Sequence, residues 1–452
     1  QKKRSRESSR FETSTSKIDE YKKIKISQIN FVGYDLLNKK STVVGIIEND
    51  KFVNNTNQNG QNLEIITDST TFYPEGGGQV GDSGIIFNDN FKFEVRDTQE
   101  VIKGIITHIG VLKSGKISIG DKVFNNVDEQ NRKDSGRNHT ATHLLHSALR
   151  KRLGNHVRQA GSLVEPDRLR FDFSHPKALS KAEISDVQNL VSTQINLDSS
   201  IRKSEDKYND AIKRGALAFF GDRYDQTVRL IEIGDESTFS FEVCGGTHVQ
   251  STGELGQFII VSESSIGAGL RRIEAYSGRR AKEFLDSKIE SLNILSKQLN
   301  CKPEDIKDKV EFLSKNLDLY SKKIDYSKTK IINMLAEEIA DKSVVQNEIN
   351  IVSNVVNLEP AMLKELSDKI QDYIPNSLII LGTSTIKGPV VIVKSTKKAI
   401  EAGYDAREIV KMISEIINGR GGGKPEMAQA GGDDNTKLIN IENIDLEHLN
   451  KN

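Results

Sequence analysis

The sequence predicts an α+β protein of several domains, and three observations support this fold class. Short β-branched runs broken by Gly, Asn and Asp fill residues 21–130, a pattern typical of strands. Helical and strand-like segments alternate in residues 131–280 and again in residues 346–440. A long helical stretch lies between these two regions, at residues 281–345. A chain of 452 residues has room for two to four domains.

The composition excludes several classes of protein. Hydrophobic residues make up 36% of the chain and charged residues 28%, and the formal net charge is zero. No apolar run approaches the roughly 18 residues of a membrane helix. Two cysteines exclude a disulfide scaffold and suit a reducing compartment. We therefore expect a cytoplasmic protein that does not bind a membrane.

Residues 1–20 are polar and charged, which predicts a flexible lead-in. The first residue is Gln and not Met, and no apolar segment of a secretory signal follows it. This beginning favours a fragment of a longer chain.

Residues 21–130 predict a small β-barrel. The segments STVVGIIEND, KFEVRD and GIITHIGVL are β-branched runs separated by turn residues. The same region holds DSTTFYPEGGGQVGDSG, which begins at Asp68. Its three consecutive glycines are similar to a phosphate-binding loop, but we interpret them as one wall of a pocket whose centre lies further along the chain.

Residues 131–280 predict a mixed α/β domain. NHTATHLLHSALRKRL has its apolar residues at helical spacing, and a second helix is expected near residues 180–200. Strand-like pieces follow or precede these helices: GSLVE, RLRFDFS, TVRLIEIG and GQFIIVSES.

Residues 281–345 predict a helical hairpin or coiled-coil segment. The apolar residues of this stretch are spaced 4, 3, 4, 3 and 4 apart, as in a heptad seam: Ile306, Val310, Leu313, Leu317, Tyr320 and Ile324. Such a seam suits either a hairpin or a dimer contact. Residues 346–440 then predict a small α/β domain that ends in a glycine-rich loop, GRGGGKPEMAQAGG.

Two pairs of residues predict a metal site. His139 and His143 are four residues apart on a predicted helix, so both imidazoles leave the same face. Cys244 and His248 have the same spacing in the loop CGGTH, whose two glycines allow a tight fold around an ion. Nitrogen and sulfur ligands favour Zn²⁺. Either pair alone is more often an ordinary surface or core feature, and His146 is either a spare ligand or a residue that orients a ligand.

At these motifs the chain resembles a known family. RNHTATHLLHSALRKRLGNHVRQAGSLVEPDRLRFDFSH and CGGTHVQSTGELG resemble the editing domain of alanyl-tRNA synthetases, and freestanding editing proteins share the same zinc motifs. DSTTFYPEGGGQVGDSG and GRGGGKPEMAQAGG resemble the family's two glycine-rich motifs. The resemblance covers about residues 20–440. No segment resembles the family's aminoacylation domain.

The resemblance implies that the chain hydrolyses Ser or Gly wrongly attached to alanine tRNA, since a pocket built for Ala rejects near-isosteres poorly. The zinc ligands of the family match His139, His143, Cys244 and His248. Thr142 and Gln159 match positions near the substrate, with Thr142 as the reader of the serine hydroxyl. Gly77 and Gly78 then approach the aminoacylated end of the tRNA.

The C-terminal domain is expected to bind tRNA and to mediate a homodimer. Arg420 and Lys424 lie in its glycine-rich segment, where backbone N–H groups and basic side chains suit phosphate. Two alternatives stay open. One is a freestanding editing protein; the other is an RNA-binding and dimerisation module whose zinc is purely structural, because four protein ligands fill a structural tetrahedral site.

Overall fold

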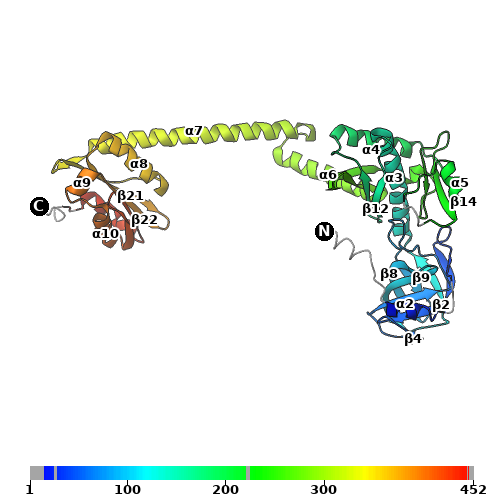
Figure 1. Cartoon of the computed structure of the whole chain (residues 1–452). Coiled ribbons are helices and arrows are strands. Elements are labelled where there is room, and N and C mark those ends of the chain that lie inside the picture. Colours follow the sequence, from blue (N-terminus) through cyan, green and yellow to red (C-terminus); the bar gives the residue numbers. More distant parts are fainter. Residues whose placement is uncertain (1–14, 25–27, 220–223, 445, 447–452) are drawn as a thin grey trace. The chain divides into compact units, whose positions relative to one another are not determined.

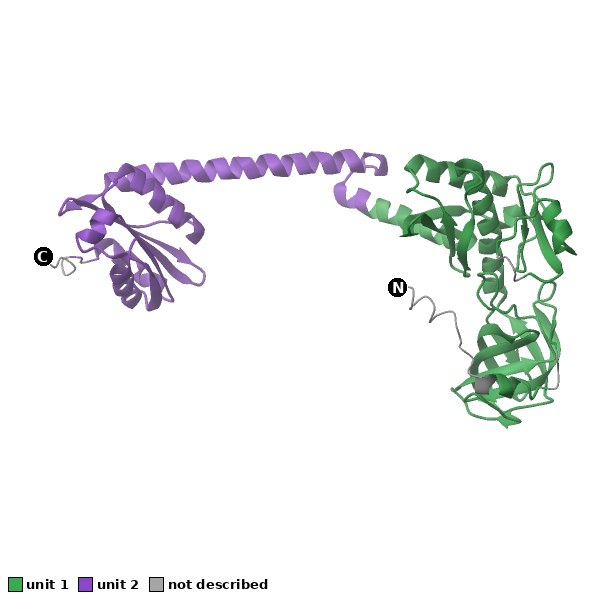
Figure 2. Ribbon diagram, viewed as in Figure 1, with its two compact units in different colours: residues 1–294 green, residues 295–452 purple. Residues whose placement is uncertain are grey.

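The computed structural model describes residues 15–24, 28–219, 224–444 and 446. Contacts within the chain divide it into two compact units, residues 1–294 and 295–452 (Figure 2). Of the expected lead-in, residues 1–14 lie outside the described residues, and Thr15–Tyr21 forms helix α2. Within the described residues, every helix is too short or too polar to cross a membrane.

A closed barrel of six strands forms the first part of the first unit (Figure 1). Strand β11 pairs with β2 as well as with β7, and this double pairing closes the ring. In ring order the strands are β2 (Asn38–Glu48), β11 (Lys122–Val127), β7 (Gly84–Phe87), β8 (Phe91–Ile102), β9 (Ile105–Gly115) and β5 (Asn62–Thr67). The remaining strands of this part are short: β1 (Asn30–Phe31), β3 (Lys51–Phe52), β4 (Asn55–Thr56), β6 (Ser69–Thr70) and β10 (Ile117–Ser118).

Alternation along the strands fills the barrel. Residues of one face of each strand point inward, and the interior holds fully buried Ile46, Ile65 and Phe93. Helix α2 covers part of the outside, where the Tyr21 hydroxyl donates to the buried carboxylate of Glu64. The barrel predicted from the β-branched runs is therefore present.

The second part of this unit packs two helices on two antiparallel sheets. Helix α3 (Glu129–Leu153) contacts α4 (Lys181–Asn196) and the first sheet, and its apolar residues join one buried core. That sheet has the order β12 (Gln159–Val164), β13 (Leu169–Ser174), β18 (Leu270–Ser277) and β17 (Phe258–Gly267). The second sheet has the order β14 (Ile201–Lys207), β15 (Thr227–Ile233) and β16 (Ser240–Val243), and two short helices are α5 (Tyr208–Lys213) and η2 (Thr252–Leu255).

Two long helices occupy the segment predicted to be helical. They are α6 (Gly278–Leu299) and, after the short η3 (Pro303–Asp305), α7 (Ile306–Asp341). The division between the two units falls within α6. Along α7, the seam residues from Val310 to Ile324 are between 39% and 69% exposed, so within the described residues this apolar stripe is largely uncovered.

The second unit ends in a six-stranded sheet with helices on both faces. The strand order is β19 (Val344–Gln346), β20 (Ile349–Val355), β21 (Ser377–Thr385), β22 (Gly388–Ser395), β24 (Met427–Gly432) and β23 (Gly419–Lys424). Helix α8 (Pro360–Tyr373) and the end of α7 share one core with this sheet. On the other face lie α9 (Lys397–Glu401), α10 (Ala406–Ile416) and η4 (Asn435–Asn443).

The glycine-rich segment at residues 419–432 is not the loop that its composition predicts. It is the hairpin β23–β24, in which the backbone groups of the two strands pair with each other. The absence of side chains at Gly421 lets α10 lie directly on β23, because a Cβ there would collide with Val410. Glycines suggest a turn by composition alone, but glycine is also the residue that lets a helix pack closely on a strand.

Candidate metal centre

Helix α3 supplies two of the four predicted ligands. It begins at the N-cap Asp128, whose side chain accepts a hydrogen bond from the backbone N–H of Asn131 and so satisfies a free helix donor. His139 and His143 are buried, at 4% and 5% exposure, and their rings stack with centroids 5.3 Å apart. The helix therefore presents both imidazoles on one face, as their spacing predicts.

The loop after β16 supplies the other two. Arg229 holds this loop by donating to the carbonyl oxygens of Cys244 (3.1 Å) and Gly246 (2.7 Å). Tyr34, from the barrel part, donates its hydroxyl to the carbonyl of Gly245 at 2.5 Å. A Cβ at Gly246 would collide with the His139 ring, so the loop can approach α3 this closely only with glycine at that position.

The four predicted ligands meet in space. One ligand atom of each of His139, His143, Cys244 and His248 lies within 4.8 Å of all the others. The Cys244 Sγ atom is 3.2 Å from His139 Nε2 and 3.4 Å from His248 Nε2. A nitrogen and a sulfur bound to one tetrahedral zinc ion lie about 3.5 Å apart, given the usual bond lengths. The spacing of these atoms thus fits a metal ion.

Hydrogen bonds to Nδ1 fix the tautomers of His139 and His248. Gln79 Oε1 accepts from the backbone N–H of Thr247 (2.9 Å) and lies 2.7 Å from His139 Nδ1, which must therefore donate. Thr140 Oγ1 gives its own hydrogen to a helix carbonyl and lies 3.1 Å from His248 Nδ1, which donates to it in turn. In both rings the lone pair of Nε2 is left facing the cluster, as a metal ligand requires.

The third imidazole contacts a carboxylate. His143 Nδ1 lies at an ion-pair distance of 2.8 Å from Glu242 Oε2 but does not meet hydrogen-bond geometry, and the buried Nε2 of the same ring also has no hydrogen-bond partner among the described residues. His146, left open by the spacing argument, is outside the group of four, and its Nδ1 hydrogen-bonds Glu242 Oε1 at 2.9 Å. A buried imidazole nitrogen without a hydrogen-bond partner, in a ring that lies beside three other ligands, is a second observation that fits a metal ion.

The electrostatics of the cluster favour a thiolate. Burial opposes ionisation of Cys244, but the surrounding imidazoles, His139 first, lower the pKa of its thiol well below the usual value. Burial would likewise raise the pKa of Glu242, yet His143 and His146 lower it below its ordinary range. Thiolate and carboxylate are thus both available as anions, and thiolate is the form that binds metal.

The residues expected near the substrate lie in two places. Gln159 begins β12 and donates to Ser162 Oγ at 3.0 Å, and that hydroxyl lies 3.5 Å from the carbonyl oxygen of Gly77. Gly78 lies so close to Ser162 that a Cβ would collide with it. Thr142 is on α3, and its hydroxyl donates to the carbonyl of Asn138 at 2.8 Å. The structure thus groups Gly77, Gly78 and Gln159, whereas the Thr142 hydroxyl contacts its own helix.

The glycine-rich segment of the barrel reaches the cluster through one residue. Its carbonyl at Gly78 accepts from the backbone of Val164, and Gln79 bridges to the same strand, β12. The fully buried Gln79 side chain then contacts His139 and Thr247. The glycines therefore place Gln79 against the metal centre, which the composition of the segment does not reveal.

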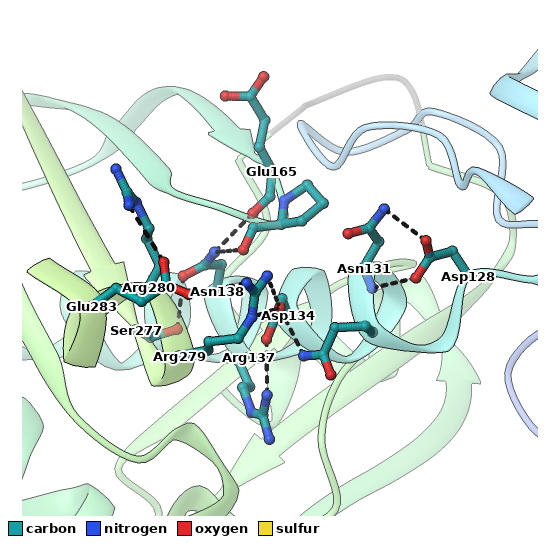
Figure 3. Close-up of polar contacts among 12 residues, drawn as sticks. Asp128, Asn131, Asp134, Arg137, Asn138, Glu165, Ser277, Arg279, Arg280 and Glu283 are labelled. Atoms are coloured by element: carbon teal, nitrogen blue, oxygen red, sulfur yellow. Dashed lines mark hydrogen bonds and ion pairs between the residues drawn. The ribbon is translucent and has the colours of Figure 1, made fainter.

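A polar network fixes α3 in this unit (Figure 3). The buried Asp134 carboxylate accepts from Arg279 of α6 at 2.9 Å. One turn further along, Asn138 donates to the carbonyl of Glu165 (2.8 Å) and accepts from the Ser277 hydroxyl (2.7 Å). Because these bonds join α3 to β18, α6 and the β12–β13 turn, the two histidines that follow are held in place.

Sequence reasoning missed the three outer contacts Gln79, Thr140 and Glu242. A signal exists for Glu242, which stands in β16 two residues before Cys244, the spacing at which side chains of an extended chain leave on the same side. Gln79 directly follows the three glycines, but its partner is 60 residues away. Arg420 and Lys424 lie on β23 in the second unit, and both are exposed.

Three family comparisons match separate parts of the chain. Residues 1–131 match "tRNA synthetases class II (A)", and residues 348–447 match the "DHHA1 domain". Residues 228–274 match the "Threonyl and Alanyl tRNA synthetase second additional domain", and this range contains Cys244 and His248. The class II match was not anticipated from the sequence; its described residues form α2 and the barrel.

Curated relatives align along nearly the whole chain. An alanine–tRNA ligase of Fervidobacterium nodosum is 43% identical over 416 residues, 92% of this chain and 46% of the relative. One of Thermoanaerobacter sp. is 38% identical over 436 residues, 96% of this chain and 49% of the relative. The solved C-Ala domain of Aquifex aeolicus alanyl-tRNA synthetase matches 24% of the chain and 99% of its own length, at 20% identity and a TM-score of 0.22.

These relatives extend well beyond the aligned region, since the chain spans about half the length of the curated relatives it matches. The alignments nevertheless cover 92% and 96% of this chain. Together, the domain matches and the identity over more than nine-tenths of the sequence place this chain in the alanyl-tRNA synthetase family.

Proposed function

We propose that this chain is the editing portion of an alanine–tRNA ligase. In this proposal it is a zinc-dependent deacylase that removes serine or glycine wrongly attached to alanine tRNA. One observation carries the proposal. Three imidazoles and a thiolate converge within 4.8 Å, in a region that overlaps the match to the second additional domain of threonyl and alanyl tRNA synthetases. This donor set is the one that zinc prefers.

The residues on β12 and the glycine-rich segment form the proposed substrate side. Gly77, Gly78 and Gln159 lie together around Ser162, and Gln79 links them to His139. Backbone without side chains admits a ligand closely, so this side suits the aminoacylated 3′ end of a tRNA. Thr142 keeps a lone pair free after donating to its helix and is proposed to accept from the serine hydroxyl.

A cavity of about 250 Å³ supports an RNA substrate. It lies against Thr247 and His248, and Lys203 and Arg229 line it. The Lys203 ammonium donates to the carbonyl of His248 at 3.3 Å. Arg132 and Lys133 also line this cavity, as do the acidic residues Asp35 and Glu254, and the excess of cations suits the phosphate groups that precede the terminal nucleotide.

Hydrolysis requires a water molecule to attack the ester carbonyl carbon, after which the bond to the ribose oxygen breaks. When bound, a zinc ion supplies either activation of that water or polarisation of the ester. The chain's own residues hold the ligands, of which His139 and His143 are buried and Cys244 and His248 half-buried, and orient the ester through the substrate side. Stabilisation of the developing oxyanion is the largest contribution that such a site offers.

The test is hydrolysis by the purified chain of Ser-tRNA, Gly-tRNA and Ala-tRNA, each carried on alanine tRNA. We expect the first two to be hydrolysed and Ala-tRNA to be largely spared. Four protein ligands favour a second reading, in which the zinc is purely structural. Zinc-loaded, folded chain that hydrolyses none of the three substrates would support that reading and contradict the proposal.

A further inference from the structure

A single buried carboxylate joins two histidines behind the metal centre. Glu242 is 4% exposed and is the penultimate residue of β16, two residues before Cys244. Its Oε2 lies 2.8 Å from Nδ1 of the ligand His143, and its Oε1 lies 2.9 Å from Nδ1 of His146. His146 is not one of the four clustered residues, so the carboxylate contacts one ligand and one residue that is not a ligand.

Both nitrogens that face the carboxylate must carry hydrogen. An ionised carboxylate accepts hydrogen bonds and donates none, and a buried one is stable only when its oxygens are satisfied. With its proton on Nδ1, which lies 2.8 Å from Oε2, His143 keeps the lone pair of Nε2 free, and neither ring nitrogen has another hydrogen-bond partner in the described part of the chain. Glu242 therefore selects the tautomer of His143 that binds a metal ion.

Glu242 differs in charge from the residues that contact the other two imidazoles. Gln79 and Thr140, which hold His139 and His248, are uncharged. A divalent cation bound by one thiolate and three neutral imidazoles carries a net charge of +1 in a buried site. One carboxylate at hydrogen-bond distance from a ligand brings the sum to zero, which lowers the cost of burying the ion.

His146 is placed to hold the carboxylate. It is 1% exposed, and its ring packs against Phe171 and Phe219, with centroids 5.2 Å and 4.8 Å away. Its Nε2 has no hydrogen-bond partner among the described residues, so the bond to Glu242 is its polar contact in this packing. Oε1 contacts His146 and accepts from the Ser240 hydroxyl at 3.3 Å, while Oε2 faces His143.

We propose that Glu242 is a positioning residue of the metal centre, and that His146 braces it. The proposal rests on the metal-dependent function proposed above. The competing account is that Glu242 and the two histidines form only a buried ion pair of the core. The two accounts differ in one respect: a core ion pair affects the stability of the metal-free fold, whereas a positioning residue also affects metal affinity.

The test compares Zn²⁺ affinity, by competition with a chelator, in the full chain and in Glu242→Gln. The amide keeps the shape but offers one acceptor in place of two and has no charge. We expect affinity to fall ten- to a hundredfold, the range found when a contact behind a metal-bound histidine is lost. The Co²⁺ absorption spectrum should also change, because the geometry around His143 changes. Glu232→Gln is the matched control, since Glu232 pairs with Arg202 on the neighbouring strands, and its affinity should equal that of the wild type.

Two further variants decide the role of His146 and cover the case in which Glu242→Gln does not fold. His146→Phe keeps the aromatic packing but removes the brace, so it should weaken Zn²⁺ binding. His146→Asn keeps an N–H near the position of Nδ1 and should restore most of the affinity. Equal Zn²⁺ affinity in wild type, Glu242→Gln and His146→Phe, with only the urea midpoint lowered, would overturn the proposal. Wild-type chain that binds neither Zn²⁺ nor Co²⁺ would overturn the metal centre itself.

Discussion

Each imidazole of the metal centre has a different partner behind it. Gln79 comes from the glycine-rich segment of the barrel, Thr140 from α3 itself and Glu242 from β16. Because these partners leave Nε2 of His139 and His248 beside the Cys244 sulfur, and the His143 ring lies in the same cluster, the ligands are oriented before a metal binds. Such preorganisation lowers the entropy lost on binding, so the site should bind zinc tightly without a large change in conformation.

Thr142→Val tests the proposed reader of the serine hydroxyl. Valine keeps the shape of threonine but has no hydroxyl. The variant therefore loses the bond to the Asn138 carbonyl of the same helix and also the proposed bond from the serine hydroxyl of the substrate. Losing a hydrogen bond to serine costs about 1–3 kcal/mol, or about tenfold to a hundredfold in rate. We expect hydrolysis of Ser-tRNA to fall by that factor relative to Ala-tRNA, measured as kcat/KM for each. An unchanged ratio would leave Thr142 as a packing residue and move attention to Gln159.

At the scale of elements, the glycine-rich segment connects the barrel to the metal centre. Its residues Gly77 and Gly78 both have positive φ, +61° and +87°. They differ in surroundings, since a Cβ at Gly77 meets no atom within 4 Å, whereas one at Gly78 collides with Ser162. The segment therefore lies against β12 only because Gly78 lacks a side chain.

This difference gives a matched pair of variants. Gly77→Ala places alanine in the left-handed region, at a cost of roughly 1–2 kcal/mol, but leaves the segment on β12. Gly78→Ala adds the collision, so it should shift Gln79 away from His139 and lower both zinc affinity and the rate of Ser-tRNA hydrolysis. We expect Gly78→Ala to be the more damaging by at least tenfold in rate. Equal effects of the two variants would show that the contact with β12 does not matter for the site.

Helix α7 presents an apolar stripe that the described residues leave largely exposed. A heptad seam of this kind suits a second helix, and we predict that copies of the chain associate through it. Leu313→Gln with Leu317→Gln should convert dimer to monomer in sedimentation equilibrium. Lys315→Gln with Lys322→Gln, on the opposite face of the helix, should leave the mass unchanged. A wild type that stays monomeric at high concentration would contradict the prediction.

At the scale of the whole molecule, the second unit is expected to add affinity for tRNA. On β23, Gly421 faces α10. Side chains alternate along a strand, and Arg420 and Lys424 are one and three residues away from Gly421, so both point to the opposite face of the sheet. Both are exposed, and β23 is an edge strand. This edge offers two cations beside a backbone free of bulky side chains.

Replacing both cations measures their contribution. Arg420→Ala with Lys424→Ala should weaken binding of alanine tRNA and reduce the slope of log K against log salt by about two, one for each lost phosphate contact. Lys364→Ala, on α8, is the control and should change neither quantity. A double variant with the wild-type affinity and slope would exclude these residues from the RNA contact.

The sequence predicted elements whose signal is local, and it failed where the cause lies in packing. The heptad spacing predicted α7, and the paired spacing of His139, His143, Cys244 and His248 predicted a cluster that the structure brings together. The glycines of residues 419–432 predict a loop, whereas they form the hairpin β23–β24, because the glycine that lets α10 pack on β23 is also typical of a turn. Gln79 and Glu242 were missed, since their roles depend on contacts with α3 made across 60 and about 100 residues of chain.

Whether the hydrolysis depends on zinc is tested by the rate of Ser-tRNA hydrolysis by the purified chain as its metal is removed and restored. Chelation should abolish hydrolysis, and added Zn²⁺ should restore it in the wild type. In Cys244→Ala, which loses the thiolate among the four ligands, elemental analysis should show lost zinc and added Zn²⁺ should not restore the rate. Hydrolysis that persists in metal-free chain, or in Cys244→Ala at the wild-type rate, would contradict the account.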